Sequence, residues 1–215
     1  MNRDEQRTRP VARPSAEHQA GRLAVWHPSE PTGGTWIGIN ERGIALALLN
    51  GHQRPTDPGL ASRGLIIPQL LAAGSLLEVH GLFAGLETRT FNPFRLIGVD
   101  PRAEEIHEWI WDGVNTVVNR TAWKLAHWFS SGFDEPRVVA ARTAVARRAA
   151  KEADAGRLSW VRRLHASHEP RRGPYSICLH RSDAKTVSYT EVVWQDGGTR
   201  VDYFPSSPCE ARNNL

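Results

Sequence analysis

Residues 33–50, GGTWIGINERGIALALLN, carry the strongest structural signal in the chain. Thr35–Ile39 and Ile44–Asn50 are two β-prone runs joined by the turn-forming residues Asn40–Gly43, which predicts a β-hairpin. The second strand is apolar at successive positions, so both of its faces need cover. The stretch therefore predicts a strand inside a layered structure.

Helices and further strands are predicted on the C-terminal side of this hairpin. Ser75 and Glu78 fit a capping box that opens a helix ending near Gly85. A proline that follows two acidic residues, with apolar residues at helical spacing after it, predicts another helix. The full set comprises a short helix entered from Ser62, the helix at Ser75, a second hairpin around Asp100–Pro101, a covering helix over Pro136–Ala153, and strand-like runs at 175–181, 186–195 and 199–205, the last two joined by Asp196–Gly198.

The segment 6–33 is predicted to be a long polar loop, because four prolines interrupt it. Elsewhere the strands come in blocks with helices between the blocks. This order is typical of packed antiparallel layers and differs from the strict alternation of a parallel fold. We therefore expect an α+β fold of mainly antiparallel sheets and helices, in a single domain over residues 1–215.

The composition is that of an ordinary globular protein, with 40% hydrophobic and 23% charged residues in a chain of 215. The longest clean apolar run, Ile44–Leu49, is too short to cross a bilayer, and the start has no secretory leader. The two cysteines, Cys178 and Cys209, form no CxxC pair. These features predict a soluble, cytoplasmic protein without a membrane span.

The net charge of +4 comes from one segment, residues 136–172, which holds ten Lys or Arg and only three acidic residues. Such a segment is typical of a solvated helix face, of a surface for an acidic partner, or of a nucleic-acid site. No known nucleic-acid motif interleaves aromatic residues with these arginines. We therefore predict a solvated face and no nucleic-acid binding.

The common catalytic motifs GxSxG, GxGxxG and HExxH, and a Walker loop, are absent from the sequence. The closest histidine pair, His165 and His168, lies in a basic stretch that we expect to be solvated, so no metal site is predicted. Cys178 is expected to be a buried core thiol, with a reactive thiol as the alternative.

Two polar spots remain, Asn2–Glu5 at the start and Asn50 at the end of the apolar strand. An Asn at the rim of a buried strand can donate its amide to a carbonyl or an oxyanion. Asn50–Gly51 is also an ordinary turn signal. The residues alone leave both interpretations open and favour the turn.

The sequence resembles the NRDE family, whose eukaryotic member is transport and Golgi organisation protein 2. The likeness rests on an ordered series: Asn2-Arg3-Asp4-Glu5, RTRP, GGTWIGINERGIALALLN, RGL, SSGFDEPRVVAAR and GPYSICLHRSDAKTVSYTEV. The family is similar in pattern to N-terminal-nucleophile hydrolases. The resemblance implies an αββα sandwich with Asp4 and Asn50 as candidate catalytic residues, and a pocket rim formed by Asn2, Arg3, Asp4, Glu5, Trp36 and Asn50.

Family members normally begin Met-Cys and reach the motif after a strand, a turn and a second strand. The resemblance therefore implies an N-terminally incomplete domain here, without the first strands and the cysteine nucleophile. It implies a small-molecule handling role, in haem trafficking or acyl-thioester metabolism, with haem as a possible cofactor. The alternative is a cysteine amidohydrolase when full length. The ligand and the oligomeric state stay open.

The motif is expected to be a structured strand end. Successive side chains of a strand face opposite ways, so one of Arg3 and Asp4 must point inward. We expect the inward residue to be Asp4, held by hydrogen bonds near Asn50, with Arg3 facing the outer layer or Glu5.

Overall fold

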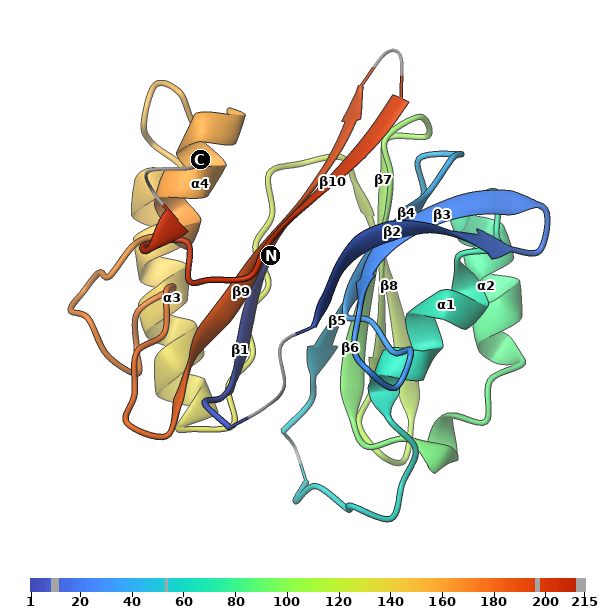
Figure 1. Cartoon of the computed structure of the whole chain (residues 1–215), viewed down its shortest axis with the longest axis horizontal. Coiled ribbons are helices and arrows are strands. Elements are labelled where there is room, and N and C mark those ends of the chain that lie inside the picture. The colour runs from blue at the N-terminus through green and yellow to red at the C-terminus, as the bar shows by residue number, and fades with distance from the viewer. Residues whose placement is uncertain (9–11, 53, 196–197, 212–215) are drawn as a thin grey trace. The chain divides into compact units, whose positions relative to one another are not determined.

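The computed structural model describes residues 1–8, 12–52, 54–195 and 198–211 (Figure 1). The chain divides into two compact units. Unit 1 comprises Met1–Val11, Leu125–Thr190 and Tyr203–Leu215, and unit 2 comprises Ala12–Lys124 and Glu191–Asp202. The expectation of one domain over residues 1–215 stays a prediction.

Unit 2 is built on a seven-stranded antiparallel sheet in which each strand pairs with the next along the chain. Its strands are β2 (Arg13–Ala20), β3 (Leu23–Ser29), β4 (Ile37–Asn40), β5 (Ala45–Asn50), β6 (Phe94–Asp100), β7 (Glu105–Trp111) and β8 (Thr116–Ala122). Both predicted hairpins, β4–β5 and β6–β7, are confirmed.

Strand β5 is central in this sheet, between β4 and β6. Leu46 and Leu48 are buried, whereas Ala45, Ala47 and Leu49 are only partly buried. One face is therefore fully covered and the other is partly covered, so the expected position inside a layered structure is borne out more fully on one face than on the other.

Helices cover one face of the sheet of unit 2 (Figure 1). They are the 3-10 turn η1 (Arg63–Leu65), α1 (Ile66–Leu70) and α2 (Leu76–Ala84), with a second 3-10 turn, η2 (Thr88–Thr90), before β6. The Ser75 hydroxyl accepts from the Glu78 amide, and Ser62 accepts from Gly64, so both predicted helix starts are confirmed. Apolar side chains of α1, α2, β5 and β6 form the core.

The predicted polar loop at 6–33 is wrong, because its residues include β2 and β3. Strand β2 lies at the edge of the sheet and is mostly exposed, so its sequence RPSAEHQA has no apolar face to reveal it. An edge strand also tolerates a proline such as Pro14, since one row of its backbone groups faces solvent. The opposite edge, β8, is also mostly exposed, and the sequence did not predict it.

Unit 1 contains the strands of a second sheet, in the order β1 (Asn2–Gln6), β9 (Ala184–Gln195), β10 (Gly198–Phe204), and β9 and β10 extend into unit 2. Helices α3 (Glu135–Ala149) and α4 (Leu158–His165) belong to the same unit. Val145 and Ala146 of α3 pack with Trp160 and Leu164 of α4 in a small apolar core.

The covering helix at 136 is confirmed, although it ends at Ala149 and not at Ala153. The strand expected at 175–181 is wrong: the segment forms only a single bridge between His180 and Lys185. Asp196 and Gly197 of the predicted turn lie outside the described residues. The α+β class with antiparallel sheets is confirmed. Within the described ranges, no helix is long and apolar enough to cross a membrane.

Candidate functional site

The opening motif Asn2–Glu5 forms β1 and pairs antiparallel with β9 of unit 1. Arg3 lies opposite Ser188, and Asp4 lies opposite Thr186, so the register shifts between Arg3 and Asp4. Val187 is the extra residue, so the bulge lies on β9 and bends that strand. The motif is thus held in a sheet, opposite an irregular part of β9.

Asp4 is bound on both of its carboxylate oxygens. The Thr186 hydroxyl donates to Oδ1 at 2.6 Å, and Arg142 Nη1 of α3 donates to Oδ2 at 3.2 Å. Thr186 Oγ1 in turn accepts from the Leu179 amide at 2.8 Å. A carboxylate that is fixed in this way can orient neighbouring groups. The catalytic role that the resemblance implies for Asp4 stays a prediction.

Asn2 connects β1 to two other segments of unit 1. Its Nδ2 donates to the carbonyl oxygens of His165 at 3.0 Å and Ile177 at 2.9 Å. Its Oδ1 lies 3.1 Å from His165 Nδ1, where a neutral imidazole can donate. Burial lowers the pKa of His165 well below its ordinary value, so this histidine is neutral at physiological pH.

Asp4 was expected to be the inward residue of the pair Arg3 and Asp4, but Arg3 is the more deeply buried side chain. The Arg3 side chain is only 6% exposed, and its Nη2 lies 3.4 Å from Glu5 Oε1. The Asp4 side chain is 24% exposed. Arg3 was expected to face the outer layer or a carboxylate such as Glu5, and its pairing with Glu5 is confirmed. The irregularity in register adds Val187 on β9 and no residue on β1, so it does not explain why Arg3 is the more deeply buried of the two.

The other predicted rim residues lie in unit 2. Asn50 is exposed at the end of β5, opposite Phe94. Trp36 is 7% exposed, and its carbonyl oxygen accepts from the Leu48 amide. Because Asp4 belongs to unit 1, a joint site of Asp4 and Asn50 stays a prediction, as does their part in an amidohydrolase.

A cavity of about 550 Å³ opens in unit 1 between α3, α4 and the segment after α4. Val145, Trp160 and Leu164 form its apolar side. Its polar side carries four arginines and two glutamates, namely Arg148, Arg163, Arg171, Arg172, Glu152 and Glu169. The cavity therefore combines an apolar wall with an excess of guanidinium groups.

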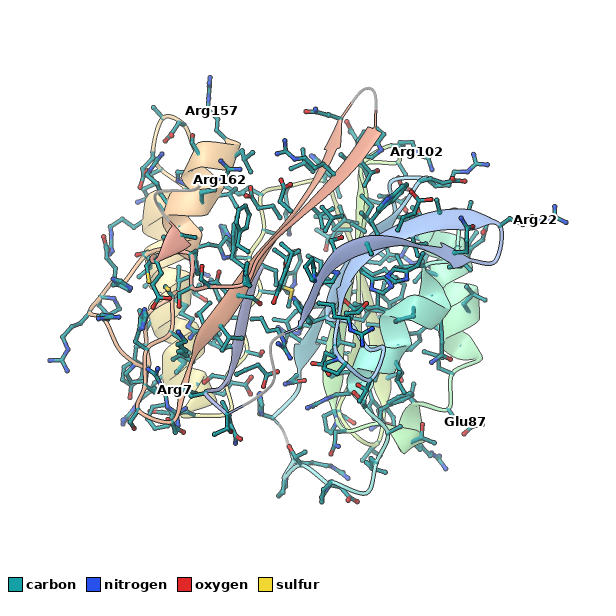
Figure 2. The ribbon with its side chains drawn as sticks, in the orientation of Figure 1. Arg7, Arg22, Glu87, Arg102, Arg157 and Arg162 are labelled. Atoms are coloured by element: carbon teal, nitrogen blue, oxygen red, sulfur yellow. The ribbon has the colours of Figure 1, made fainter. Side chains whose placement is uncertain are left out.

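Several residues of the basic segment are engaged in ion pairs. Arg142 pairs with Asp4, Arg148 with Glu169, and Arg163 with both Glu152 and Asp154. Arg157, by contrast, projects away from the start of α4 (Figure 2). This mixture is typical of a solvated helical face, and the predicted absence of nucleic-acid binding stays a prediction.

His168 and Cys209 also line the cavity. Their ligand atoms lie within 4.8 Å of those of Cys178 and His180. The expectation that His165 and His168 lie on a solvated face is wrong, because both are partly buried. Cys178 is fully buried as expected. Burial, and then the neighbouring Cys209 thiol, raise its pKa to about 12, so without a cation it is protonated and a poor nucleophile.

This group of four residues was not predicted from the sequence, although Cys178 and His180 stand in a C-x-H pair that could have drawn attention to it. His168 and Cys209 are far from that pair in sequence, and only the fold brings them to it. The segment 175–181 was also expected to be a strand, in which Cys178 and His180 would share one face without further partners.

Comparison with protein families matches residues 1–167 to Transport and Golgi organisation 2. A comparison with curated proteins finds no significant match. The matched region starts at the Asn2–Glu5 motif, includes the β4–β5 hairpin and ends after α4. Since it covers more than half of the chain, this protein belongs to the Transport and Golgi organisation 2 family.

Proposed function

We propose that this protein binds an anionic small molecule with an apolar part, and that the cavity of unit 1 is the binding site. The observation that carries the proposal is the pairing of an apolar wall, including Trp160, with arginines at the opening. A volume of about 550 Å³ falls in the range of about 300–1,000 Å³ that is usual for ligand pockets. Guanidinium groups suit carboxylates and phosphates.

Haem and long-chain acyl thioesters of coenzyme A share this chemistry, because each joins an apolar body to carboxylates or phosphates. Both are implied by the family resemblance, and the proposal includes either cargo. A place in haem trafficking or in acyl-thioester metabolism, in the cytoplasm, is part of the same proposal.

We further propose the αββα layering of N-terminal-nucleophile hydrolases. It is supported by what each unit contributes: unit 2 carries α1 and α2 on one face of its sheet, and unit 1 supplies α3 and α4 together with β1 and β9. Unit 2 thus holds the seven-stranded sheet with one pair of helices, and unit 1 holds the other pair of helices with β1 and the part of β9 up to Thr190. A crystal structure with the two sheets side by side in one plane would refute the layering.

The binding proposal is tested by calorimetric titration of the purified chain with haemin and, separately, with palmitoyl-coenzyme A. Arg171, which is exposed at the cavity, is changed to Glu. Loss of a charge-assisted hydrogen bond costs about 1.5–3 kcal/mol, so Arg171→Glu is expected to weaken binding about 10-fold or more.

The matched control is Arg22→Glu, because Arg22 projects from the β2–β3 turn of unit 2 (Figure 2). Binding of haemin alone assigns the haem role, and binding of palmitoyl-coenzyme A alone assigns the acyl-thioester role. The proposal fails if neither compound binds, or if Arg22→Glu weakens binding as much as Arg171→Glu does.

A further inference from the structure

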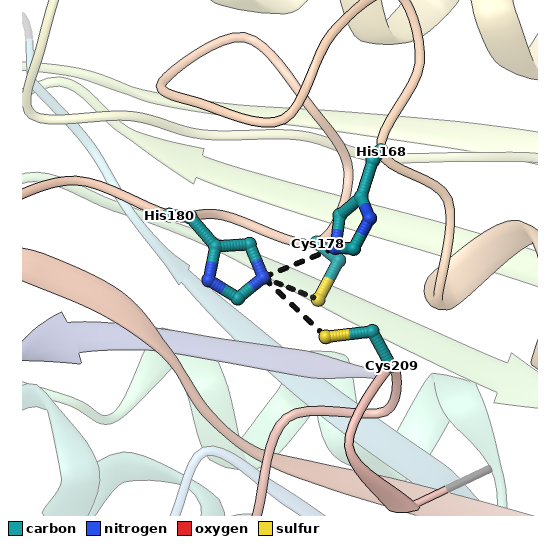
Figure 3. Close-up of side chains that lie close together, drawn as sticks. All are labelled: His168, Cys178, His180 and Cys209. Atoms are coloured by element: carbon teal, nitrogen blue, oxygen red, sulfur yellow. Dashed lines mark hydrogen bonds between the residues drawn. The ribbon is translucent and has the colours of Figure 1, made fainter.

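Four side chains of unit 1 converge on one point: His168, Cys178, His180 and Cys209 (Figure 3). Each offers one ligand atom, and the four atoms all lie within 4.8 Å of one another. His180 Nε2 is central, at 3.1 Å from His168 Nε2, 3.6 Å from Cys178 Sγ and 3.4 Å from Cys209 Sγ. Within the described ranges, this is the group of His, Cys, Asp and Glu that is geometrically able to hold a metal ion.

These separations match the edges of a zinc tetrahedron. With Zn–N bonds of about 2.0–2.1 Å and Zn–S bonds of about 2.3 Å, tetrahedral angles place two nitrogens about 3.3 Å apart, and a nitrogen and a sulfur about 3.6 Å apart. The three measured distances lie within a few tenths of an ångström of these values. The other three pairs of ligand atoms lie within 4.8 Å of one another, so side-chain movements of about 1 Å or less would close a tetrahedron around the ion.

The backbone fixes the ligands independently of any ion. The Cys178 amide donates to the Ser167 carbonyl oxygen at 3.0 Å, next to His168, and the Ser176 hydroxyl donates to the Cys178 carbonyl oxygen at 2.6 Å. The His180 amide donates to the Gly173 carbonyl oxygen at 3.2 Å. The segment after α4 and the segment before β9 are thereby tied together at the positions that carry three of the four ligands.

We infer that His168, Cys178, His180 and Cys209 bind one zinc ion in a closed tetrahedral site. Two thiolates and two imidazoles are the donor set of structural zinc sites, and two thiolates balance the charge of the ion. Four protein ligands leave no open position, so the ion stabilises unit 1 and does not activate water. It joins the chain after α4, the segment before β9 and the chain after β10.

Nothing in the family match assigns this site, because the match ends at residue 167 and all four ligands follow it. The site adjoins the proposed cargo cavity, because His168, Cys209 and Arg172 also line that cavity. The two proposals are nevertheless tested with different variants and different probes. The cavity test changes Arg171, whereas the zinc test changes the ligands themselves and Arg172. Failure of one is therefore distinguishable from failure of the other.

Arg172 gives the proposal a sharper consequence. Its Nη2 lies 3.2 Å from His180 Nδ1, and a guanidinium can only donate, so Nδ1 is an acceptor in this arrangement. Zinc on Nε2 requires the hydrogen on Nδ1, and the exposed Arg172 must then move away. The variant Arg172→Gln offers an amide oxygen that accepts from Nδ1–H, and it is expected to bind zinc about 10-fold more tightly.

The experiment uses the full chain, freed of metal by a chelator and kept reduced. Zinc and, separately, cobalt(II) are titrated in. We expect one ion per chain, a raised melting temperature, and a cobalt spectrum with tetrahedral d–d bands and sulfur-to-cobalt charge transfer. Cys209→Ser is expected to weaken zinc binding about 100-fold or more, because a hydroxyl is a poor zinc ligand.

His18→Gln, on the exposed strand β2, is the control and is expected to leave zinc binding unchanged. If Cys209→Ser fails to fold, the comparison of Arg172→Gln with the parent chain still tests the site. An octahedral cobalt spectrum, a zinc affinity weaker than about 1 μM, or equal affinity in the parent and Cys209→Ser chains would overturn the inference.

Discussion

Arg142 of α3 and Asp4 of β1 form an ion pair at 3.2 Å in which the arginine is the more deeply buried partner. The Arg142 side chain is 5% exposed, and the Asp4 side chain is 24% exposed. The pair joins residues that are far apart in the sequence and fastens the motif strand to the helix. A buried guanidinium depends on its carboxylate for compensation of its charge. Removal of the Asp4 side chain is therefore expected to cost more stability than removal of the Arg142 side chain.

Asp4→Ala is expected to destabilise the protein by about 2–4 kcal/mol, because it leaves Arg142 buried without its carboxylate. Glu17→Ala, on the exposed strand β2, is the control and is expected to change stability by less than about 0.5 kcal/mol. Arg142→Met in the Asp4→Ala background is expected to recover part of the loss, since the buried charge is then absent. Urea unfolding measures all three, and equal small shifts in the two single variants would refute the argument.

Trp160 of α4 is expected to stabilise unit 1 through its contacts with α3. It is 1% exposed, and its Nε1 donates to the Ala149 carbonyl oxygen at the end of α3 at 3.0 Å. Trp160→Phe should cost about 1 kcal/mol for the lost hydrogen bond beyond the change in packing, and Trp160→Ala about 3–5 kcal/mol. Urea unfolding measures both variants, and similar losses in the two would contradict the expected contribution of ring packing, because Phe keeps an aromatic ring and Ala does not.

The hairpins and caps were predictable because their signals are local. The Asn40–Gly43 turn and the Ser75 cap need only neighbouring residues, and both are found where expected. Strand β2 has no such signal, since its pairing with β3 and not its composition makes it a strand. The fold gives an edge strand its partner, and its own polar sequence cannot show this.

The candidate sites likewise depend on contacts that local sequence signals do not reveal. The resemblance pointed to Asp4, but its partners Arg142 and Thr186 are contributed by α3 and β9, and no spacing rule links them to the motif. His168 and Cys209 are likewise brought together by the course of the chain after α4 and after β10. Contacts between residues distant in sequence are set by topology, which single-sequence patterns do not encode.

His165 predicts how stability responds to acid. Its folded-state pKa is lowered by burial, so in the pH range below its unfolded value of 6.5 the unfolded chain binds more protons. The stabilising contribution is complete above that value and is lost as the pH falls. Between about pH 7.5 and pH 5.5, His165→Gln is expected to lose about 1 kcal/mol less stability than the parent chain. Equal losses in urea unfolding at the two pH values would contradict this.

Asn40 gives the sharpest prediction for unit 2. The residue is fully buried at the turn of the β4–β5 hairpin, and its Oδ1 accepts from the Arg42 and Ile44 amides. Its Nδ2 donates to the carbonyl oxygens of Leu71 at 2.9 Å and Ala73 at 2.7 Å. One side chain thus closes the turn and fastens it to the chain between α1 and α2.

Asn40→Asp keeps the shape and the acceptor of this side chain but replaces the amide donor with an oxygen that faces two carbonyl oxygens. The cost is expected to be about 3 kcal/mol or more at neutral pH, because a buried charge then lacks its partners. Protonation of the new carboxyl restores one donor. The deficit relative to the parent chain should therefore shrink as the pH falls toward about 5, in line with a pKa raised by burial.

Asn115→Asp, at an exposed position before β8, is the matched control, with an expected change below about 0.5 kcal/mol. Thermal and urea unfolding of both variants at two pH values measure the effect, and a deficit that is small, or that does not shrink on acidification, would show that the Nδ2 hydrogen bonds do not hold the hairpin.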